Sequence, residues 1–414
     1  MSDRMGIALL VAMLFAASCA AEEDGLPWLP EGEGCAPCRV RGVTLELPAR
    51  AHPYVGDLWP MARAPDGSLY AAFGDGTGMA NCLPTLLPGE EDEFDAAYVE
   101  EHPGCYRPRE TANEYCEVFA CTRCLPQCLY TPAGLLRLSG RLPDLAPCGG
   151  VDQCVVARHI PYGDLRIYDH GDKPSSLVFV GDRLYAHMHH PPGAPLRGYL
   201  ARSADRGRSW EMRPDSPWGP QSNFRVMMFL QGGPGDAPRH LYAFGIGEEV
   251  GADFRVQRVH LARVRLARDG GADPILDYRA WRYFAGLDAR GRPRWTEDEG
   301  QAQPLSGLFT IAQGSALYHP ALDRYLFLTG FAGVLPGRRL GFDFDDPYPA
   351  GVLFEAEAPW GPWSQVGAFP GGYVATLIPK DLSPDGVWIA AAGAGPFTYN
   401  LNIARLRLER RARR

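Results

Sequence analysis

Asp57 and Asp75 are the residues whose types and spacing best suit chemistry. They lie near the two ends of residues 56–76, GDLWPMARAPDGSLYAAFGDG. This stretch predicts a β-hairpin that turns at residues 65–68, because proline presets φ and glycine tolerates positive φ. Both carboxylates then lie at the open end of the hairpin. Two neighbouring carboxylates are the minimum equipment for hydrolysis of a glycosidic bond.

The centre of the turn decides how the two aspartates face each other. A turn centred on Asp66 places Asp57 and Asp75 directly opposite, with Cβ atoms about 5 Å apart, and a turn centred after Asp66 makes them diagonal at about 7 Å. Carboxyl groups about 5–5.5 Å apart favour retention, and about 6.5–9.5 Å favours inversion. Close like charges raise one pKa, which gives an acid beside a base or nucleophile. The competing interpretation is that both aspartates only cap turns.

Other polar residues are expected at the same face. Asp172 and Lys173 precede a second apolar strand, where they would bind hydroxyl groups or tune a neighbouring carboxylate; a solvated charge pair is the alternative. Asn223 and Gln313 are expected to add polar contacts.

Three further features have a functional and a structural interpretation. Trp59 shares a strand face with Asp57 and could stack on a sugar ring, although packing in the core is the favoured role. His187 and His189 share a strand face in a histidine cluster, for which packing is favoured over metal binding. Glu355 is expected to be a solvated strand charge rather than a third carboxylate of the site.

The strand–turn–strand pattern of residues 58–74 returns four times, and each copy is followed by a further strand or pair of strands. The later copies are residues 175–189, 225–245, 314–330 and 373–393. With 48 glycines, 38 prolines and little helical periodicity, the chain is expected to be all-β. Five such units predict a five-bladed β-propeller over residues 53–410. Residues 77–133 hold most of the cysteines and are expected to form a disulfide-rich insertion in the first blade.

One short motif supports the propeller. Ser203, Asp205, Gly207 and Trp210 match the Asp-box, S-x-D-x-G-x-x-W, which occurs on the blade turns of sialidase-like propellers. Its aspartate caps the turn and its tryptophan packs into the blade, so Asp205 is expected to be structural.

The N-terminus predicts export. Residues 5–17 form an apolar run too short to span a bilayer, and small residues lead to Cys19 as in a bacterial lipobox. Residues 1–19 are therefore expected to be a signal peptide with Cys19 as the lipidated residue, and residues 20–52 a Pro/Gly-rich tether. The protein is placed at the cell envelope through this anchor, on an outer membrane if the host has one, or is otherwise secreted.

Cysteine number agrees with export. Eleven cysteines become ten without Cys19, and none follows Cys154. In an oxidising compartment these ten are expected to form disulfides, although two Cys-x-x-Cys motifs could be zinc ligands instead. No metal or other cofactor is expected. The net charge of −8 and the absence of a basic patch before the C-terminal tail argue against nucleic acid as a partner.

An ordered set of short phrases across residues 53–410 resembles the DUF4185 domain family of bacteria. The phrases are GDLWP…DGSLYAAFGDG at 56–76, DKP at 172–174, Y…G…G-x-P-x-W at 283–295, LYHP…DRY at 317–325, APWGPW at 358–363, and IPK…DG at 378–386 followed by YN at 399–400. The resemblance implies a five-bladed propeller and kinship with glycoside hydrolases, since some members are endo-D-arabinanases. The cysteine-rich insertion departs from the family pattern.

Two functions follow as hypotheses. The first is a cell-envelope glycoside hydrolase that cleaves a polysaccharide, with an arabinan-like polymer as the expected substrate, through Asp57 and Asp75. The second is a non-catalytic propeller that binds carbohydrate or protein. A sialidase is a weaker third interpretation, because no arginine triad for a carboxylate is evident.

Overall fold

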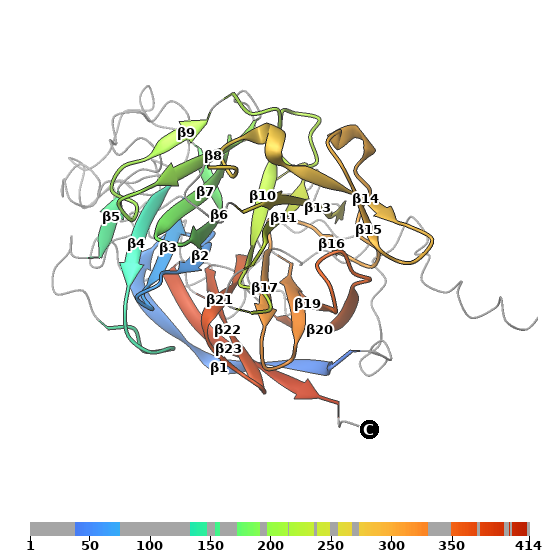
Figure 1. The fold of residues 1–414 in the computed structure, drawn as a ribbon. Coiled ribbons are helices and arrows are strands. Elements are labelled where there is room, and N and C mark those ends of the chain that lie inside the picture. The colour runs from blue at the N-terminus through green and yellow to red at the C-terminus, as the bar shows by residue number, and fades with distance from the viewer. Residues whose placement is uncertain are drawn as a thin grey trace, which may run out of the picture.

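The chain is all-β in a computed structural model (Figure 1). The structure describes residues 38–74, 133–146, 154–157, 172–190, 197–213, 215–235, 238–248, 256–266, 273–329, 349–370, 373–392, 397 and 400–411. The helices in these ranges are two single 3₁₀ turns, η8 (Tyr278–Ala280) and η9 (Glu299–Gln301). No helix in the described ranges is long and apolar enough to cross a membrane.

All five predicted hairpins are present, and the structure confirms their strand pairing. We refer to the strand that begins each hairpin as a first strand. The five first strands are β2 (Met61–Arg63), β6 (Lys173–Val180), β10 (Val226–Gln231), β17 (Ser315–His319) and β21 (Tyr373–Ser383). Their partners are β3 (Leu69–Phe73), β7 (Arg183–His189), β11 (His240–Ile246), β18 (Arg324–Leu328) and β22 (Gly386–Ala392).

Outer strands continue each hairpin as an antiparallel meander. They are β4 (Gly134–Leu138) and β5 (Val155–Ala157); β8 (Gly198–Ser203) and β9 (Glu211–Arg213); β13 (His260–Arg265), β14 (Arg282–Leu287) and β15 (Pro293–Thr296); β19 (Pro349–Ala356) and β20 (Ser364–Pro370); and β23 (Asn400–Arg410). Two meanders join into one nine-stranded sheet through a short parallel pairing of β10 with β17. A separate two-stranded sheet pairs β12 (Gln257–Arg258) with β16 (Phe309–Thr310).

The last sheet is completed by the first described strand of the chain. β1 (Val40–Val55) pairs antiparallel with β23, and the two lie side by side in Figure 1. The predicted tether over residues 20–52 therefore does not hold from Val40 onward. Apolar residues alternate with polar ones at Val43 and Leu45, as in a strand with one buried face, and both pack against a hydrophobic cluster.

The first strands form a closed ring in the middle of the molecule (Figure 1): β2 contacts β6 and β21, β6 contacts β10, and β17 contacts β10 and β21. Residues at or near the ends of all five first strands line one cavity, among them Arg63, Val180, Gln231, Tyr318 and Leu382. The first strands therefore run in the same direction. Their opposite ends, where they begin, meet at the other face of the ring, which we call the start face.

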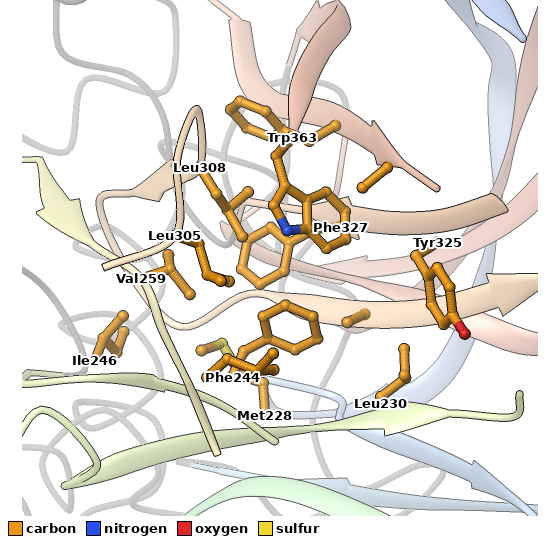
Figure 2. Close-up of a cluster of buried hydrophobic side chains, with 14 of the residues drawn as sticks. Met228, Leu230, Phe244, Ile246, Val259, Leu305, Leu308, Tyr325, Phe327 and Trp363 are labelled. Carbon is orange, nitrogen blue, oxygen red and sulfur yellow. The ribbon is translucent and has the colours of Figure 1, made fainter. Parts of the chain in front are cut away.

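The core consists of side chains between neighbouring sheets. One cluster, shown in Figure 2, joins the meanders that begin with β10 and β17. The ring of Phe244 lies 5.4 Å from that of Phe327 and 5.6 Å from that of Trp363. Aromatic contacts of this kind restrict how the two meanders pack against each other, because the rings pack only in a few arrangements.

The Asp-box has the structural role that its sequence predicts. Ser203 Oγ accepts from the Gly207 amide at 2.6 Å, and Asp205 accepts from the Ser209 amide at 2.8 Å. Trp210 donates to the Gly207 carbonyl at 3.0 Å. Desolvation raises the pKa of Asp205, but the hydrogen bonds from Ser209 and Ser203 outweigh it and hold that pKa at about 2.

Candidate functional site

Asp57 lies at the start face, in the segment that leads to the beginning of β2 at Met61, and is 5% exposed. Its amide donates to the Gly74 carbonyl at 3.0 Å, and the Gly74 amide donates back to the Asp57 carbonyl at 3.0 Å. The β2–β3 ladder has the register expected for a turn centred on Asp66, since Met61 pairs with Ala71 and Arg63 with Leu69. This register changes before β2, so the residue opposite Asp57 is Gly74.

The change of register has a local backbone cause. Leu58 and Trp59 both have positive φ, 65° and 41°, which few non-glycine residues adopt. The Trp59 amide donates to the Asp57 carbonyl at 2.8 Å, and the Trp59 indole donates to the Gly56 carbonyl at 3.0 Å. This compact bulge between Asp57 and β2 sets where the carboxylate lies. Backbone strain of this kind concentrates at functional sites.

Gly74 leaves the space that the Asp57 side chain occupies. A Cβ atom at position 74 would lie 2.9 Å from Asp57 Oδ1 and 2.9 Å from Leu58 Cδ1. Real Cβ atoms essentially never come that close, so any larger residue at 74 has to displace the carboxylate.

The substitution Gly74→Ala is therefore expected to lower any activity of Asp57 by about 10–100-fold, because a displacement of about 1 Å can cost about 10²-fold. The free energy of unfolding should change little, since both displaced atoms are the ends of flexible side chains. Rates and urea unfolding of the two proteins test this. Gly219→Ala is the matched control, as nothing lies within 4 Å of its added Cβ. Equal losses in both variants would contradict the expectation.

Asp75, the partner predicted for Asp57, lies outside the described residues, as do Cys19 and residues 77–132 of the predicted insertion. Their predicted roles stay predictions. Among the cysteines, Cys38 and Cys154 belong to the described ranges, and Cys154 is disulfide-bonded.

A second buried carboxylate, Asp172, lies directly before β6 and is fully buried. The Tyr199 hydroxyl donates to Asp172 Oδ2 at 2.5 Å, and His190 Nε2 lies 3.2 Å from Asp172 Oδ1. The alternative of a solvated charge pair is therefore wrong for Asp172. Tyr199 was not identified from the sequence as part of this site. It belongs to the outer strand β8, and nothing in the sequence indicates that its side chain contacts a residue beside the inner strand β6.

Lys173 begins β6, is 8% exposed, and pairs in register with His189 of β7. Ser175 joins the buried histidines, since its Oγ lies 2.6 Å from His189 Nδ1 and 3.1 Å from His187 Nδ1. The Met227 amide donates to His187 Nδ1 at 3.4 Å, which ties β10 to this cluster. The predicted sharing of a strand face by His187 and His189 is thus confirmed, and both side chains are fully buried.

Gln313 also belongs to this face. It precedes β17, is 1% exposed, and donates to the Pro174 carbonyl at 3.3 Å. Asn223 is partly exposed, and its backbone amide donates to Glu299 Oε1 at 2.9 Å. The structure thus brings Gln313 to the start of β6 together with Asp172 and Lys173, while Asn223 is held by a backbone contact.

Trp59 lies in the core, the role that its sequence context favours. It is fully buried, and its ring lies 5.8 Å from that of Phe73. A sugar ring has no access to its face in this structure.

Glu355 is buried rather than solvated, so the expectation for this residue is wrong. It accepts from the Arg39 amide at 2.6 Å, the Val40 amide at 2.9 Å and Arg324 Nε at 3.1 Å. Desolvation raises its pKa. Glu355 therefore attaches the beginning of β1 to β19, and its role is structural. In the described ranges no group of three or more histidine, cysteine or acidic residues is arranged to hold a metal ion.

Buried histidines make the stability depend on pH. Burial lowers the pKa of His187 well below its usual value and that of His260 to about 4. Unfolded histidine titrates near 6.5, so between about pH 6.5 and 4 the unfolded chain binds more protons than the folded one. The free energy of unfolding is therefore expected to decrease as the pH is lowered from about 6.5 to 4, by at most about 1.4 kcal/mol per pH unit for each histidine.

Urea unfolding at several pH values between 7.5 and 4.5 measures this dependence. The substitution His260→Gln should reduce the slope of the free energy of unfolding against pH. Hydrogen bonds hold the pKa of Asp66 and of Asp205 at about 2. These carboxylates therefore lose their contribution to the free energy of unfolding only below the pH range of the experiment. Burial raises the pKa of Glu299 and Glu355, which act in the opposite direction and are common to both proteins. An unchanged slope in His260→Gln would contradict the expectation.

Comparisons with known proteins found structural likeness only. No protein-family model and no curated protein matches the chain. The GH43_1 enzyme from Xanthomonas citri is 12% identical over 86% of this chain and 90% of its own, with a TM-score of 0.42. The α-L-arabinanase of Penicillium chrysogenum, complexed with arabinobiose, is 11% identical over 87% of this chain and 98% of its own, with a TM-score of 0.36.

A third structure is reported with a GH130 family of mannoside phosphorylases that contains glycoside hydrolases targeting β-1,2 mannosidic linkages in Candida mannan. It is 10% identical over 93% of this chain and 96% of its own, with a TM-score of 0.40. These identities and TM-scores are too low to support an argument about the chain. Its fold is therefore defined by its own strand order and pairing.

Proposed function

We propose that the chain is a cell-envelope glycoside hydrolase that cleaves a polysaccharide through Asp57 and Asp75, with an arabinan-like polymer as its substrate. The observation that carries the proposal is Asp57, a buried carboxylate that a strained bulge and Gly74 hold at the start face. Asp75 follows Gly74 directly in the sequence, and its part in the pair rests on the sequence.

The architecture that we propose for this function is a five-bladed propeller. The five meanders, the ring of first strands and the closure of the last sheet by β1 support it. The resemblance to the DUF4185 domain family supports the choice of an arabinan, and the lipobox-like Cys19 supports a lipid anchor.

In the proposed reaction, one of the two carboxyl groups donates a proton to the leaving oxygen. The other either activates a water molecule or attacks the anomeric carbon itself. Asp172 and Lys173 are expected to orient substrate hydroxyl groups or to set the electrostatic potential at the acid pair, since β6 lies beside β2. Gln313 is expected to fix the position of β6 through its contact with the Pro174 carbonyl.

Incubation of the full chain with an arabinan and a panel of other polysaccharides tests the proposal, with new reducing ends as the readout. Proton NMR of the first products then reports retention or inversion, and with it the separation of the carboxyl groups. Cleavage of another polymer would replace the arabinan as the substrate. Cleavage that persists when both aspartates are changed to asparagine would refute the assignment of the site.

The second candidate function is non-catalytic binding of carbohydrate or protein. The observation that favours it is the deep burial of Asp57 and Asp172, because a catalytic carboxylate has to reach its substrate. Binding of a panel polymer without new reducing ends, measured by calorimetry, would select this function.

A further inference from the structure

A cavity of about 1280 Å³ lies at the face opposite Asp57, where the first strands end. Its wall includes Arg63 at the end of β2, Val180 of β6, Gln231 of β10 and Tyr318 of β17. The proposed glycosidase chemistry uses none of these residues. Pockets for single small molecules span about 300–1,000 Å³, so this cavity has room for a larger ligand.

Three arginines line the cavity, Arg63, Arg239 and Arg265, and all three are exposed. Within the described ranges none of them forms an ion pair, and no described aspartate or glutamate lines the cavity with them. Arginines elsewhere behave differently, as Arg282 pairs with Glu297 at 2.5 Å and Arg324 with Glu355 at 3.1 Å. Among the described residues of the lining, the three guanidinium groups therefore carry positive charge that no acidic side chain of the lining neutralises.

His240 lines the cavity beside these arginines. It pairs in register with Arg265, which places the two side chains on one face of the β11–β13 ladder. Desolvation lowers the pKa of His240, and the charges of Arg263, Arg265 and Arg239 lower it further. The field of the arginines thus disfavours further positive charge at this wall, as it would favour an anion.

Aromatic and apolar surface lies between these charges. Tyr242 and Tyr318 line the cavity and are half-buried, and Leu230 and Leu317 are buried residues of the same lining. Tyr318 donates its hydroxyl proton to Asp323 Oδ1 at 2.7 Å, which fixes the orientation of its ring. Rigid aromatic rings beside charged groups suit a ligand that has both an apolar ring face and ionised substituents.

We propose that this cavity binds an oligosaccharide that carries carboxylate or sulfate groups. An arginine guanidinium matches a carboxylate or a sulfate with two parallel hydrogen bonds, and the two tyrosines of the lining add aromatic surface beside these charges. The cavity volume fits several sugar units rather than one. This site is separate from Asp57 and does not depend on hydrolysis there.

Calorimetry of the full chain tests the proposal with four probes: a tetragalacturonate, a sulfated chondroitin tetrasaccharide, neutral maltotetraose and inorganic phosphate. Binding of one or both acidic oligosaccharides is expected, at least about 10-fold tighter than that of maltotetraose and phosphate, as charge-assisted hydrogen bonds to oxyanions require. Arg239→Gln and Arg265→Gln should each weaken it about 10-fold, since each removes one such contact.

Arg290→Gln is the matched control, because Arg290 is exposed and does not line the cavity. The preference of the two acidic probes identifies carboxylate or sulfate as the recognised group. Equal binding of maltotetraose, equal binding of phosphate, or equal affinity in Arg265→Gln and Arg290→Gln would each overturn the proposal, and so would no binding of either acidic probe. Hydrolysis through Asp57 is assayed separately, so failure of one proposal leaves the other in place.

Discussion

Asp57→Asn is expected to lower the rate of polysaccharide hydrolysis by about 10²–10⁴-fold, the contribution of a positioned acid or base. Asparagine preserves the size of the side chain and the backbone bridge to Gly74, so the fold should persist. The charge and the exchangeable proton are lost, and with them either role in the reaction. The rate of reducing-end release from the polymer that the wild-type chain cleaves measures the effect.

Asp288→Asn is the control for the loss of a carboxylate as such. Asp288 caps an outer turn, where its Oδ1 accepts from the Arg290 amide at 2.8 Å and the Arg292 amide at 2.9 Å. This variant should hydrolyse the polymer at close to the wild-type rate. If Asp57→Asn retains more than a tenth of the wild-type rate while it unfolds at the wild-type urea concentration, Asp57 is not part of the reaction.

Glu355→Ala is expected to lower the free energy of unfolding by about 3–5 kcal/mol, the usual cost of removing one partner of a buried ion pair. Arg324 is almost buried and would lose Glu355 as a partner, although it keeps Glu357 at 2.7 Å. The amides of Arg39 and Val40 would lose their acceptors as well. An unsatisfied buried donor costs about 1–3 kcal/mol by itself.

Urea unfolding followed by tryptophan fluorescence measures this loss. Glu357→Ala is the matched control, since the Glu357 side chain is 68% exposed and an exposed ion pair contributes about 0–1 kcal/mol. A loss for Glu355→Ala that does not exceed the loss for Glu357→Ala would show that the attachment of β1 does not depend on this carboxylate.

The hairpins could be predicted from the sequence because their signals are local. Pro65 to Ser68 specify one turn, and Asp385 with Gly386 another, while the strands on either side are short and apolar. The structure confirms both, with Ala64 accepting from Gly67 and Ser383 pairing with Gly386. Turn chemistry depends on four residues, so it can be recognised without knowing the rest of the fold.

Contacts between distant segments could not be predicted. β1 is a strand because β23 offers it a partner, and nothing in residues 40–55 alone identifies that partner. Glu355 was expected in solvent for the same reason, since its burial depends on the amides at the beginning of β1.

The position of Asp57 was predicted in part. Its place at the open end of the first hairpin followed from the turn, but its separation from β2 and its opposition to Gly74 did not. That depends on positive φ angles at Leu58 and Trp59, which the propensities of these residues do not indicate.

The pairing of β1 with β23 also decides the order in which the molecule can be completed. Val40 and its partner Arg410 are almost the first and the last described residues, so β1 leaves the ribosome long before β23 exists. At about 5–20 residues per second the interval is tens of seconds, during which β1 is an unpaired strand with apolar side chains. A chain that ended before residue 400 would lack β23 and would leave β1 without the strand that it pairs with from Val40 to Val55.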